Sequence, residues 1–368
     1  MFNQILSFLR RWKFPLINKL PLIIKIWLYY ISRSIKEISH LIKSPFLDYV
    51  TFQPKKKISL DLSTICQLKC PVCPTSIGIN KKGVVGQGYL KFLDFKDFIN
   101  KNPSIKRIEL SNWGEIFLNP DLKSILKYSF IKNIELTVNN GVNLNNASRE
   151  LIKSIVKYKV KSMNISLDGA TEKTYKIYRR NGNFNEVLKN IRIINYYKRK
   201  YHSEFPKLTW QFIIFGHNEH ELLAAKDMAR NLGMDLYIKY NRYSSFSPIK
   251  NKEFIRKESK KGVATREEYV HKYRKPYCPA CIQLWRSPQI NWDGKLLGCC
   301  YNIWGDYGNV FDSSFDDCLK SERYIYTKKL LLGKVEIRDD IPCYYCHNYK
   351  VIKEIPLKKR EIILNYFL

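Results

Sequence analysis

The sequence predicts an α/β fold in which a partial (β/α)6 barrel precedes a small cysteine-rich module. Two observations carry this prediction. Strand-like segments alternate with helical ones from about residue 57 to residue 240, an order that is typical of a parallel sheet with right-handed crossovers. Seven of the ten cysteines then fall between residues 276 and 350, in a turn-rich stretch that indicates a separate module.

Six segments have the residue pattern of strands, at 58–62, 106–110, 133–138, 163–167, 209–215 and 235–240. Helical patterns follow most of them, for example at 121–128, 148–157, 185–197 and 219–232. For the last helix we expect Asn218 to be the N-cap, with Glu221 three residues on, and Gly233 to end the helix. Six such units predict an incomplete TIM-type barrel rather than a closed eight-fold one.

The length and composition allow one large domain and a small one. The chain has 368 residues, of which 45% are hydrophobic and 26% are charged, so each domain can have its own core. We expect a basic amphipathic N-terminal extension, a barrel domain, a linker, a cysteine-rich auxiliary domain and a tail, at residues 1–55, 56–242, 243–275, 276–350 and 351–368.

The balance of charges is strongly basic. Lysine and arginine number 64 against 33 for aspartate and glutamate, which gives a formal net charge of +31. Such an excess attracts nucleic acid, anionic lipid or an anionic substrate. Lysine is spread along the chain together with isoleucine, asparagine and tyrosine, so we interpret most of the charge as a compositional bias.

The first fifty residues mix apolar and aromatic residues with lysine and arginine. No charge-free run reaches the roughly 18–20 residues needed to span a bilayer. The segment suits peripheral contact with an anionic membrane, and a helical extension packed on the main domain is an equal alternative. Because no signal-peptide pattern is present and the chain is long, we expect reduced thiols and a cytoplasmic protein, with or without peripheral membrane association.

Polar or metal-binding residues follow four of the predicted strands in turn. They are Cys66-x3-Cys70-x2-Cys73, Asn112 to Glu115, Asn139 to Gly141, and Asp168-Gly169. In barrels of this kind the chemistry lies past the carboxyl ends of the strands. Three cysteines on one loop, without a fourth nearby, suit a 4Fe–4S cluster with one open iron. Zinc is the alternative, although a structural zinc site needs four ligands.

This arrangement resembles the radical S-adenosylmethionine (SAM) superfamily, whose signature is the same three-cysteine spacing after the first barrel strand. The resemblance implies that Cys66, Cys70 and Cys73 hold a 4Fe–4S cluster that binds SAM. It implies reductive cleavage of SAM to a 5′-deoxyadenosyl radical, which abstracts hydrogen from a substrate, with electrons from a flavodoxin or ferredoxin. The cofactor supplies this chemistry and the protein positions and shields it.

The resemblance also assigns SAM-binding residues, namely Gly114, Glu115, Asn140, Gly141, Ser166, Asp168 and Arg179. Gly114-Glu115 matches the motif that holds the SAM ammonium, although Ile116 stands where a proline usually follows. Asn140-Gly141 matches the turn after the third strand. Ser166 and Asp168 match the residues that contact the ribose and methionine parts of SAM, and Arg179 matches the partner of its carboxylate.

The cysteine-rich region resembles the SPASM domain of radical SAM enzymes. The resemblance implies an auxiliary 4Fe–4S cluster on Cys281, Cys299, Cys343 and Cys346, with a zinc knuckle as the alternative. Cys278 is a second candidate for the first ligand. We expect Cys318 to be a buried core thiol, at most one of Cys299 and Cys300 to bind metal, and Asp293-Gly294 to form a hairpin turn.

The sequence therefore predicts a radical SAM enzyme that acts on an unidentified substrate. We favour a sugar or surface-glycan intermediate, because residues 166–191 and 211–233 resemble SPASM proteins encoded with polysaccharide genes. A peptide- or protein-modifying maturase is the alternative. A third hypothesis, of another class, is a basic zinc-binding protein that recognises nucleic acid. The sequence identifies no catalytic general base.

Overall fold

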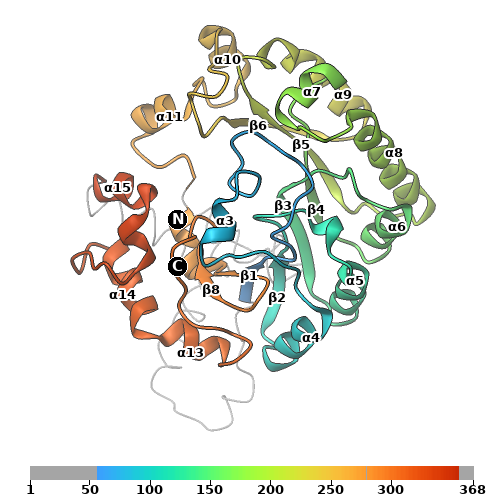
Figure 1. The fold of residues 1–368 in the computed structure, drawn as a ribbon. Coiled ribbons are helices and arrows are strands. Elements are labelled where there is room, and N and C mark those ends of the chain that lie inside the picture. The colour runs from blue at the N-terminus through green and yellow to red at the C-terminus, as the bar shows by residue number, and fades with distance from the viewer. Residues whose placement is uncertain (1–55, 279, 356–368) are drawn as a thin grey trace, which may run out of the picture. The chain divides into compact units, whose positions relative to one another are not determined.

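The computed structural model describes residues 56–278 and 280–355. Within them lies one curved sheet with the strand order β6-β5-β4-β3-β2-β1-β7-β8, seen in Figure 1. The six barrel strands pair in parallel, which confirms the predicted partial barrel. Their bounds are β1 (Lys56–Leu60), β2 (Ile105–Glu109), β3 (Glu135–Val142), β4 (Ser162–Ser166), β5 (Lys207–Ile214) and β6 (Asp235–Tyr240).

Helices connect these strands and cover the outer face of the sheet (Figure 1). The main ones are α4 (Phe92–Lys101), α5 (Leu122–Ile131), α6 (Arg149–Lys157), α7 (Glu172–Tyr178), α8 (Phe184–Lys200) and α9 (Leu222–Asn231). Helix α6 begins where the Ser148 hydroxyl accepts a hydrogen bond from the Leu151 N–H, and it buries Ile152, Ile155 and Val156. This three-to-four-residue spacing places the apolar face on the sheet.

The remaining elements follow β6. Two short helices, α10 (Lys252–Glu258) and α11 (Arg266–Tyr273), lie in the segment expected to be a linker, where Ile255 and Val263 are buried. The cysteine-rich region then forms η5 (Ala280–Ile282), α12 (Gln283–Arg286), β7 (Gln289–Ile290), β8 (Leu296–Gly298), α13 (Phe315–Lys320), α14 (Glu322–Leu331), η6 (Pro342–Tyr345) and α15 (His347–Lys353). Helix α15 continues across the boundary expected at residue 350. The N-terminal extension and most of the expected tail lie outside the described residues.

The hairpin β7–β8 extends the barrel sheet. Strand β7 pairs in parallel with β1, with Ser59 opposite Gln289, and antiparallel with β8. The turn runs through Asp293-Gly294 as predicted, with Gly294 at φ +87°, a left-handed conformation that favours glycine. The cysteine-rich module is therefore joined to the barrel through backbone hydrogen bonds.

The prediction for the start of this helical segment is confirmed in position only. Asn218 is the N-cap residue of η4 (Glu219–Glu221), which leads directly into α9, but its side chain makes no capping hydrogen bond. Its Oδ1 accepts from the Phe215 N–H, and its Nδ2 donates to the carbonyl groups of Asp168 and Ile213. Asn218 thus connects the end of β5 to Asp168, the second residue after β4. The prediction for the helix end is confirmed, because Gly233 lies at φ +65° and follows the last turn.

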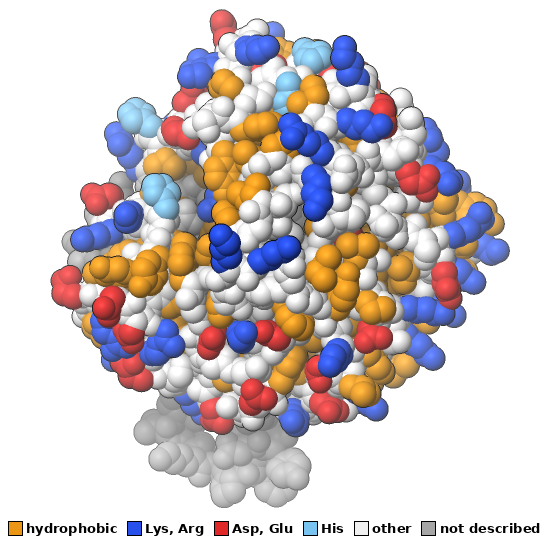
Figure 2. Space-filling view, in the orientation of Figure 1, with side chains coloured by type: hydrophobic (Ala, Val, Ile, Leu, Met, Phe, Trp, Pro, Cys, Tyr) orange, Lys and Arg blue, Asp and Glu red, His pale blue; other side chains and the backbone are white. Residues whose placement is uncertain are grey.

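Basic side chains are spread over the face of the molecule seen in Figure 2 rather than gathered into one patch. Among the described residues, none of the helices combines the length and the apolar character needed to cross a membrane.

Candidate functional site

The three cysteines of the first loop lie past the carboxyl end of β1. Cys70 is buried against Leu68, Tyr178 and Phe215, and Cys66 and Cys73 are half-buried at the edge of the same cluster. The Lys69 N–H donates to the Arg180 carbonyl at 2.9 Å, which fixes the loop to the end of α7. All three thiols are free of disulfides.

The environment of Cys66 and Cys70 penalises negative charge. Burial raises the pKa of Cys66 to about 12, and the nearby Glu115 carboxylate raises it further. Burial also raises the pKa of Cys70 to about 11, although the Arg179 guanidinium opposes this effect. A bound cationic iron centre would offset the cost of forming thiolates here. The thiols therefore fit a metal cluster.

Gly114 and Glu115 lie directly against the start of this loop. A Cβ on Gly114 would lie 2.5 Å from the Ser63 carbonyl oxygen, so only glycine allows the two backbones to approach. The Glu115 N–H donates to the Ile65 carbonyl at 2.9 Å. Its buried carboxylate accepts from the N–H groups of Asn143, at 2.6 Å, and Phe117, at 3.2 Å. Burial raises the pKa of Glu115 to about 7.

Asn140 and Gly141 lie within β3 rather than in a turn after it, which corrects the prediction. The register of β3 against β4 shifts between Val138 and Val142, so the strand continues through the irregular stretch. Gly141 has φ +120°, and a Cβ there would lie 2.6 Å from Ser166 Oγ. The Asn140 amide donates to the Ser111 carbonyl at 2.7 Å. Gly141 thus keeps space open beside Ser166.

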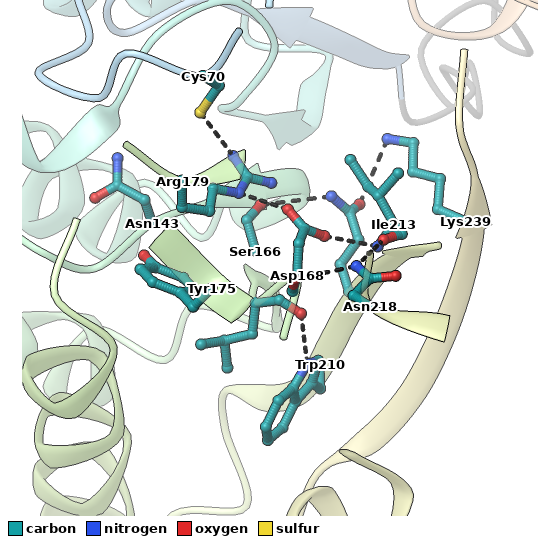
Figure 3. Close-up of polar contacts among 12 residues, drawn as sticks. Cys70, Asn143, Ser166, Asp168, Tyr175, Arg179, Trp210, Ile213, Asn218 and Lys239 are labelled. Atoms are coloured by element: carbon teal, nitrogen blue, oxygen red, sulfur yellow. Dashed lines mark hydrogen bonds and ion pairs between the residues drawn. The ribbon is translucent and has the colours of Figure 1, made fainter. Parts of the chain in front are cut away.

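Asp168 and Arg179 form a buried ion pair at the same rim (Figure 3). Arg179 Nε lies 2.6 Å from Asp168 Oδ2, and Arg179 Nη1 donates to Cys70 Sγ at 3.8 Å. Asp168 Oδ1 accepts from the Ile213 N–H at 2.6 Å. Burial raises the pKa of Asp168, while Arg179 lowers it. One guanidinium therefore connects the residues after β4 with the cysteine loop.

A second group of cysteines gathers in the C-terminal module. Burial raises the pKa of Cys281, Cys299 and Cys343. The negative charge of the nearby Cys346 raises the pKa of each of these three thiols further. The value for Cys299 is about 12. The structure thus brings together the four cysteines that the sequence assigned to the auxiliary cluster, and these thiols also suit a cationic metal centre.

Of the other three cysteines of the module, Cys278 also raises the pKa of Cys281 and of Cys299, so Cys278 lies near the assigned set. Cys278 and Cys300 are hydrogen-bonded to each other, so adjacent Cys299 and Cys300 have different partners. Cys318 is 4% exposed in the core, as the sequence predicted. Among the described residues, no three or more His, Cys, Asp or Glu side chains are placed to hold one metal ion. The thiolates of a cubane each bind a different iron and need not meet at one ion.

Comparison with known proteins identifies the family. The model of the radical SAM superfamily matches residues 60–229, and the model of the SPASM iron–sulfur cluster-binding domain matches residues 281–349. The chain therefore contains a radical SAM domain followed by a SPASM domain. The first domain implies a SAM-binding 4Fe–4S cluster, and the SPASM domain implies a second iron–sulfur site.

Similar proteins have low sequence identity to this chain. An uncharacterised protein of Methanocaldococcus jannaschii is 25% identical over 194 residues, which cover 52% of this chain and 60% of that protein. SuiB of Streptococcus suis bound to S-adenosylmethionine has a TM-score of 0.54 at 14% identity, covering 81% of this chain and 72% of SuiB. SuiB bound to its precursor peptide SuiA has a TM-score of 0.55 at 12% identity, with coverage of 81% and 71%. These structures share the fold.

Four residues of the radical SAM site were missed at the sequence level. Asn143 donates to Cys66 Sγ at 3.8 Å and accepts from Gln67 Nε2 at 2.8 Å. Gln211 Nε2 donates to Ser166 Oγ at 3.4 Å, and Lys239 Nζ donates to Gln211 Oε1 at 3.5 Å. Figure 3 shows Lys239 reaching toward the Asp168 group from β6. For Gln211 and Lys239, the available signal was a polar residue within a largely apolar strand, in β5 and β6 respectively.

Proposed function

We propose that the protein reductively cleaves SAM to methionine and a 5′-deoxyadenosyl radical, which abstracts hydrogen from an organic substrate. The single observation that carries this proposal is the convergence at one barrel rim of the cysteine loop, Glu115 and the Asp168–Arg179 pair. Cys66, Cys70 and Cys73 would hold the cluster, whose open iron supplies the reductive chemistry when it is bound.

The surrounding residues would position SAM. Glu115 offers a buried carboxylate beside the loop for an ammonium group, and the Gly114 backbone allows the close approach. The stretch of β3 at Asn140 and Gly141 leaves space beside Ser166, because Gly141 has no side chain there, so that a ribose can approach Ser166. Arg179 would bind a carboxylate, and Asp168 would hold the Arg179 guanidinium in place through their ion pair.

For the substrate we favour a sugar or surface-glycan intermediate. Its support is the resemblance of the segments around Ser166 and Gln211 to SPASM proteins encoded with polysaccharide genes. A peptide is the second candidate, because SuiB has been solved with a precursor peptide. Nucleotide-linked sugars that raise 5′-deoxyadenosine formation above the substrate-free rate, when peptides do not, would support the first candidate. The reverse result would support the second.

The central proposal is tested by SAM cleavage. Protein reconstituted anaerobically with iron and sulfide, and given a strong reductant, should convert SAM to 5′-deoxyadenosine and methionine. Replacing Cys66, Cys70 and Cys73 together by Ala should abolish the reaction, whereas Cys318→Ala should retain it. Undiminished cleavage in the triple variant would refute the proposal. A colourless protein containing zinc would instead favour the basic nucleic-acid-binding hypothesis.

We also propose that the enzyme works in the cytoplasm with a flavodoxin or ferredoxin as reductant, and that residues 1–50 contact anionic membranes peripherally. The support for membrane contact is the mixture of basic, aromatic and aliphatic residues in that segment. Sedimentation with anionic liposomes should recover full-length protein in the pellet at low salt. A variant that begins at residue 51 should stay in the supernatant. Equal recovery of the two proteins in the pellet would refute the proposed membrane contact.

A further inference from the structure

A cavity of ≈ 1030 Å³ lies apart from the cysteine loop. Helices α11 and α15 both line it, together with Cys278 and Tyr301 of the SPASM region. The two helices lie on the same side of the barrel in Figure 1. Small-molecule sites usually have volumes of about 300–1,000 Å³, so this cavity is large enough for an extended organic substrate.

The wall of this cavity is cationic. Four lining residues are basic, namely Arg242, Arg266, Arg274 and Lys275, and two are acidic, namely Glu267 and Glu354. Among the described residues, no carboxylate lies within ion-pair distance of Arg242 or Arg266. Within the described part of the chain, neither acidic residue of the wall forms an ion pair with these two guanidinium groups. A hydrogen bond from Cys300, helped by the Arg266 charge, instead lowers the pKa of the Cys278 thiol in the same wall.

Both arginines are instead held against tyrosine rings. The Arg242 guanidinium lies 4.5 Å from the ring centre of Tyr301, and that of Arg266 lies 4.8 Å from the ring centre of Tyr277. Arg266 Nε also donates to the Tyr240 carbonyl at 2.9 Å. A guanidinium with its face against a ring keeps N–H donors at its edge, which suit the paired oxygens of a phosphate.

Lys239 connects this cavity with the radical SAM site. Burial lowers the pKa of Lys239 and the charge of Arg266 lowers it further, whereas the negative charges of Cys278 and Asp168 raise it. Lys239 therefore lies within electrostatic range of Cys278 in the cavity wall and of Asp168 at the barrel rim. Lys239 Nζ also donates to Gln211 Oε1 at 3.5 Å, and Arg242 of the cavity wall follows the end of β6 by two residues. The cavity therefore lies at the end of the strand that carries Lys239.

We propose that this cavity binds the diphosphate end of an anionic organic substrate, with Arg242 and Arg266 as the phosphate-binding residues. This inference deepens the proposed function and rests on it for the later reaction of the ligand, but not for binding. Two guanidinium groups that lie against tyrosine rings in one cavity favour the paired oxygens of a small diphosphate ester, and binding of an acidic peptide is the competing outcome of the test.

The test is calorimetric titration of full-length, anaerobically reconstituted protein with inorganic pyrophosphate, with uridine diphosphate and with a hexaglutamate peptide. Wild-type protein should bind the two diphosphates. The double variant Arg242→Gln/Arg266→Gln should lose roughly tenfold or more in affinity for both, because each arginine contributes charged hydrogen bonds. Arg192→Gln removes one exposed charge from the outer helix α8 and should bind as the wild type does.

Three further measurements keep the inference open to refutation. Circular dichroism melting of each variant identifies a folding defect. The variant Arg242→Lys keeps the positive charge but loses the paired N–H donors of the guanidinium, so its affinity for the diphosphates should lie between those of the wild type and the double variant. Absence of diphosphate binding in the wild type, or equal affinity in wild type and the double variant, overturns the proposal. Tight hexaglutamate binding without diphosphate binding overturns it in favour of an acidic peptide. SAM cleavage measured in parallel separates this outcome from failure of the proposed function.

Discussion

Arg179 and Asp168 form a buried ion pair in which Nε lies 2.6 Å from Oδ2, with 13% of the arginine side chain and none of the aspartate side chain exposed. Breaking such a pair on one side leaves an uncompensated charge and costs about 3–5 kcal/mol. We predict that Arg179→Met will lower the free energy of unfolding by about this amount. Urea denaturation under anaerobic conditions measures it.

The matched double variant tests the reason for this loss. Arg179→Met combined with Asp168→Asn removes both charges, while the Asn side chain keeps an oxygen for the Ile213 N–H. The double variant should therefore be more stable than Arg179→Met alone, although neither variant should support normal SAM binding. A single and a double variant of equal stability would show that the ion pair does not determine the stability of this rim.

A second prediction concerns Asp61, which lies after β1 and joins it to the SPASM hairpin. Its Oδ2 accepts from Gln289 Nε2 at 2.9 Å. Burial raises the pKa of Asp61 to about 8, with Glu109 acting in the same direction. The unfolded carboxyl has an ordinary pKa near 3.8. Between these two values the unfolded chain binds fewer protons, so stability should fall as pH rises from about 4 to about 8.

Replacing Asp61 by Asn should remove this slope. From pH 6 to pH 8 the wild type should lose about 2–3 kcal/mol more stability than Asp61→Asn. Urea denaturation at both pH values measures the difference, with the exposed Asp97→Asn as control. A parallel loss in wild type and Asp61→Asn would show that Asp61 is ionised in the folded protein.

The contact between Asp61 and Gln289 illustrates what sequence could and could not predict. The six barrel strands were predictable, because each has a local residue pattern that is typical of buried strands. The pairing of β7 with β1 was not predictable, because β7 has only two residues and joins segments more than two hundred residues apart. Local patterns contain no information about such a pairing.

In the candidate site, too, some residues could be predicted from the sequence and others could not. Cys66, Cys70 and Cys73 were identified because their spacing is itself a chemical signal. Asn218 was assigned to a helix cap because it precedes an acidic helical segment, whereas its amide in fact joins two strand ends. Gln211 and Lys239 carry no motif, and their importance depends on which strands are neighbours. Tertiary structure decides the role of such polar residues.

A third prediction uses the close approach at Gly114. A Cβ at Gly114 would meet three backbone atoms of Ser63 and Ile65 within 2.7 Å, and backbone cannot move aside as a flexible side chain can. Gly114→Ala should displace the cysteine loop at a cost of about 1–3 kcal/mol and reduce both iron content and SAM cleavage. At Gly305 the nearest atoms lie 3.7 Å away, so Gly305→Ala is the control. Equal iron content in the two variants would contradict the prediction.

The last prediction concerns the auxiliary cluster. Cys281, Cys299, Cys343 and Cys346 lie close together, and a 4Fe–4S cluster needs four thiolates. We expect about eight irons per chain in reconstituted wild-type protein and about four in the triple variant of the first loop. Iron analysis and absorption spectra measure both. A wild-type content of about four irons per chain, or zinc in place of the other irons, would refute the auxiliary iron site without affecting the assignment of the radical SAM site.

Single replacements should then separate the ligands from the other cysteines. Cys343→Ala should lose about four irons and also solubility, because four thiolates that come from both ends of the module couple its folding to metal binding. Cys318→Ala should keep the iron, since this thiol lies in the apolar core. Cys278→Ala and Cys300→Ala should keep it as well, because these two thiols are hydrogen-bonded to each other. Loss of iron in Cys278→Ala with retention in Cys281→Ala would reassign the first ligand to Cys278.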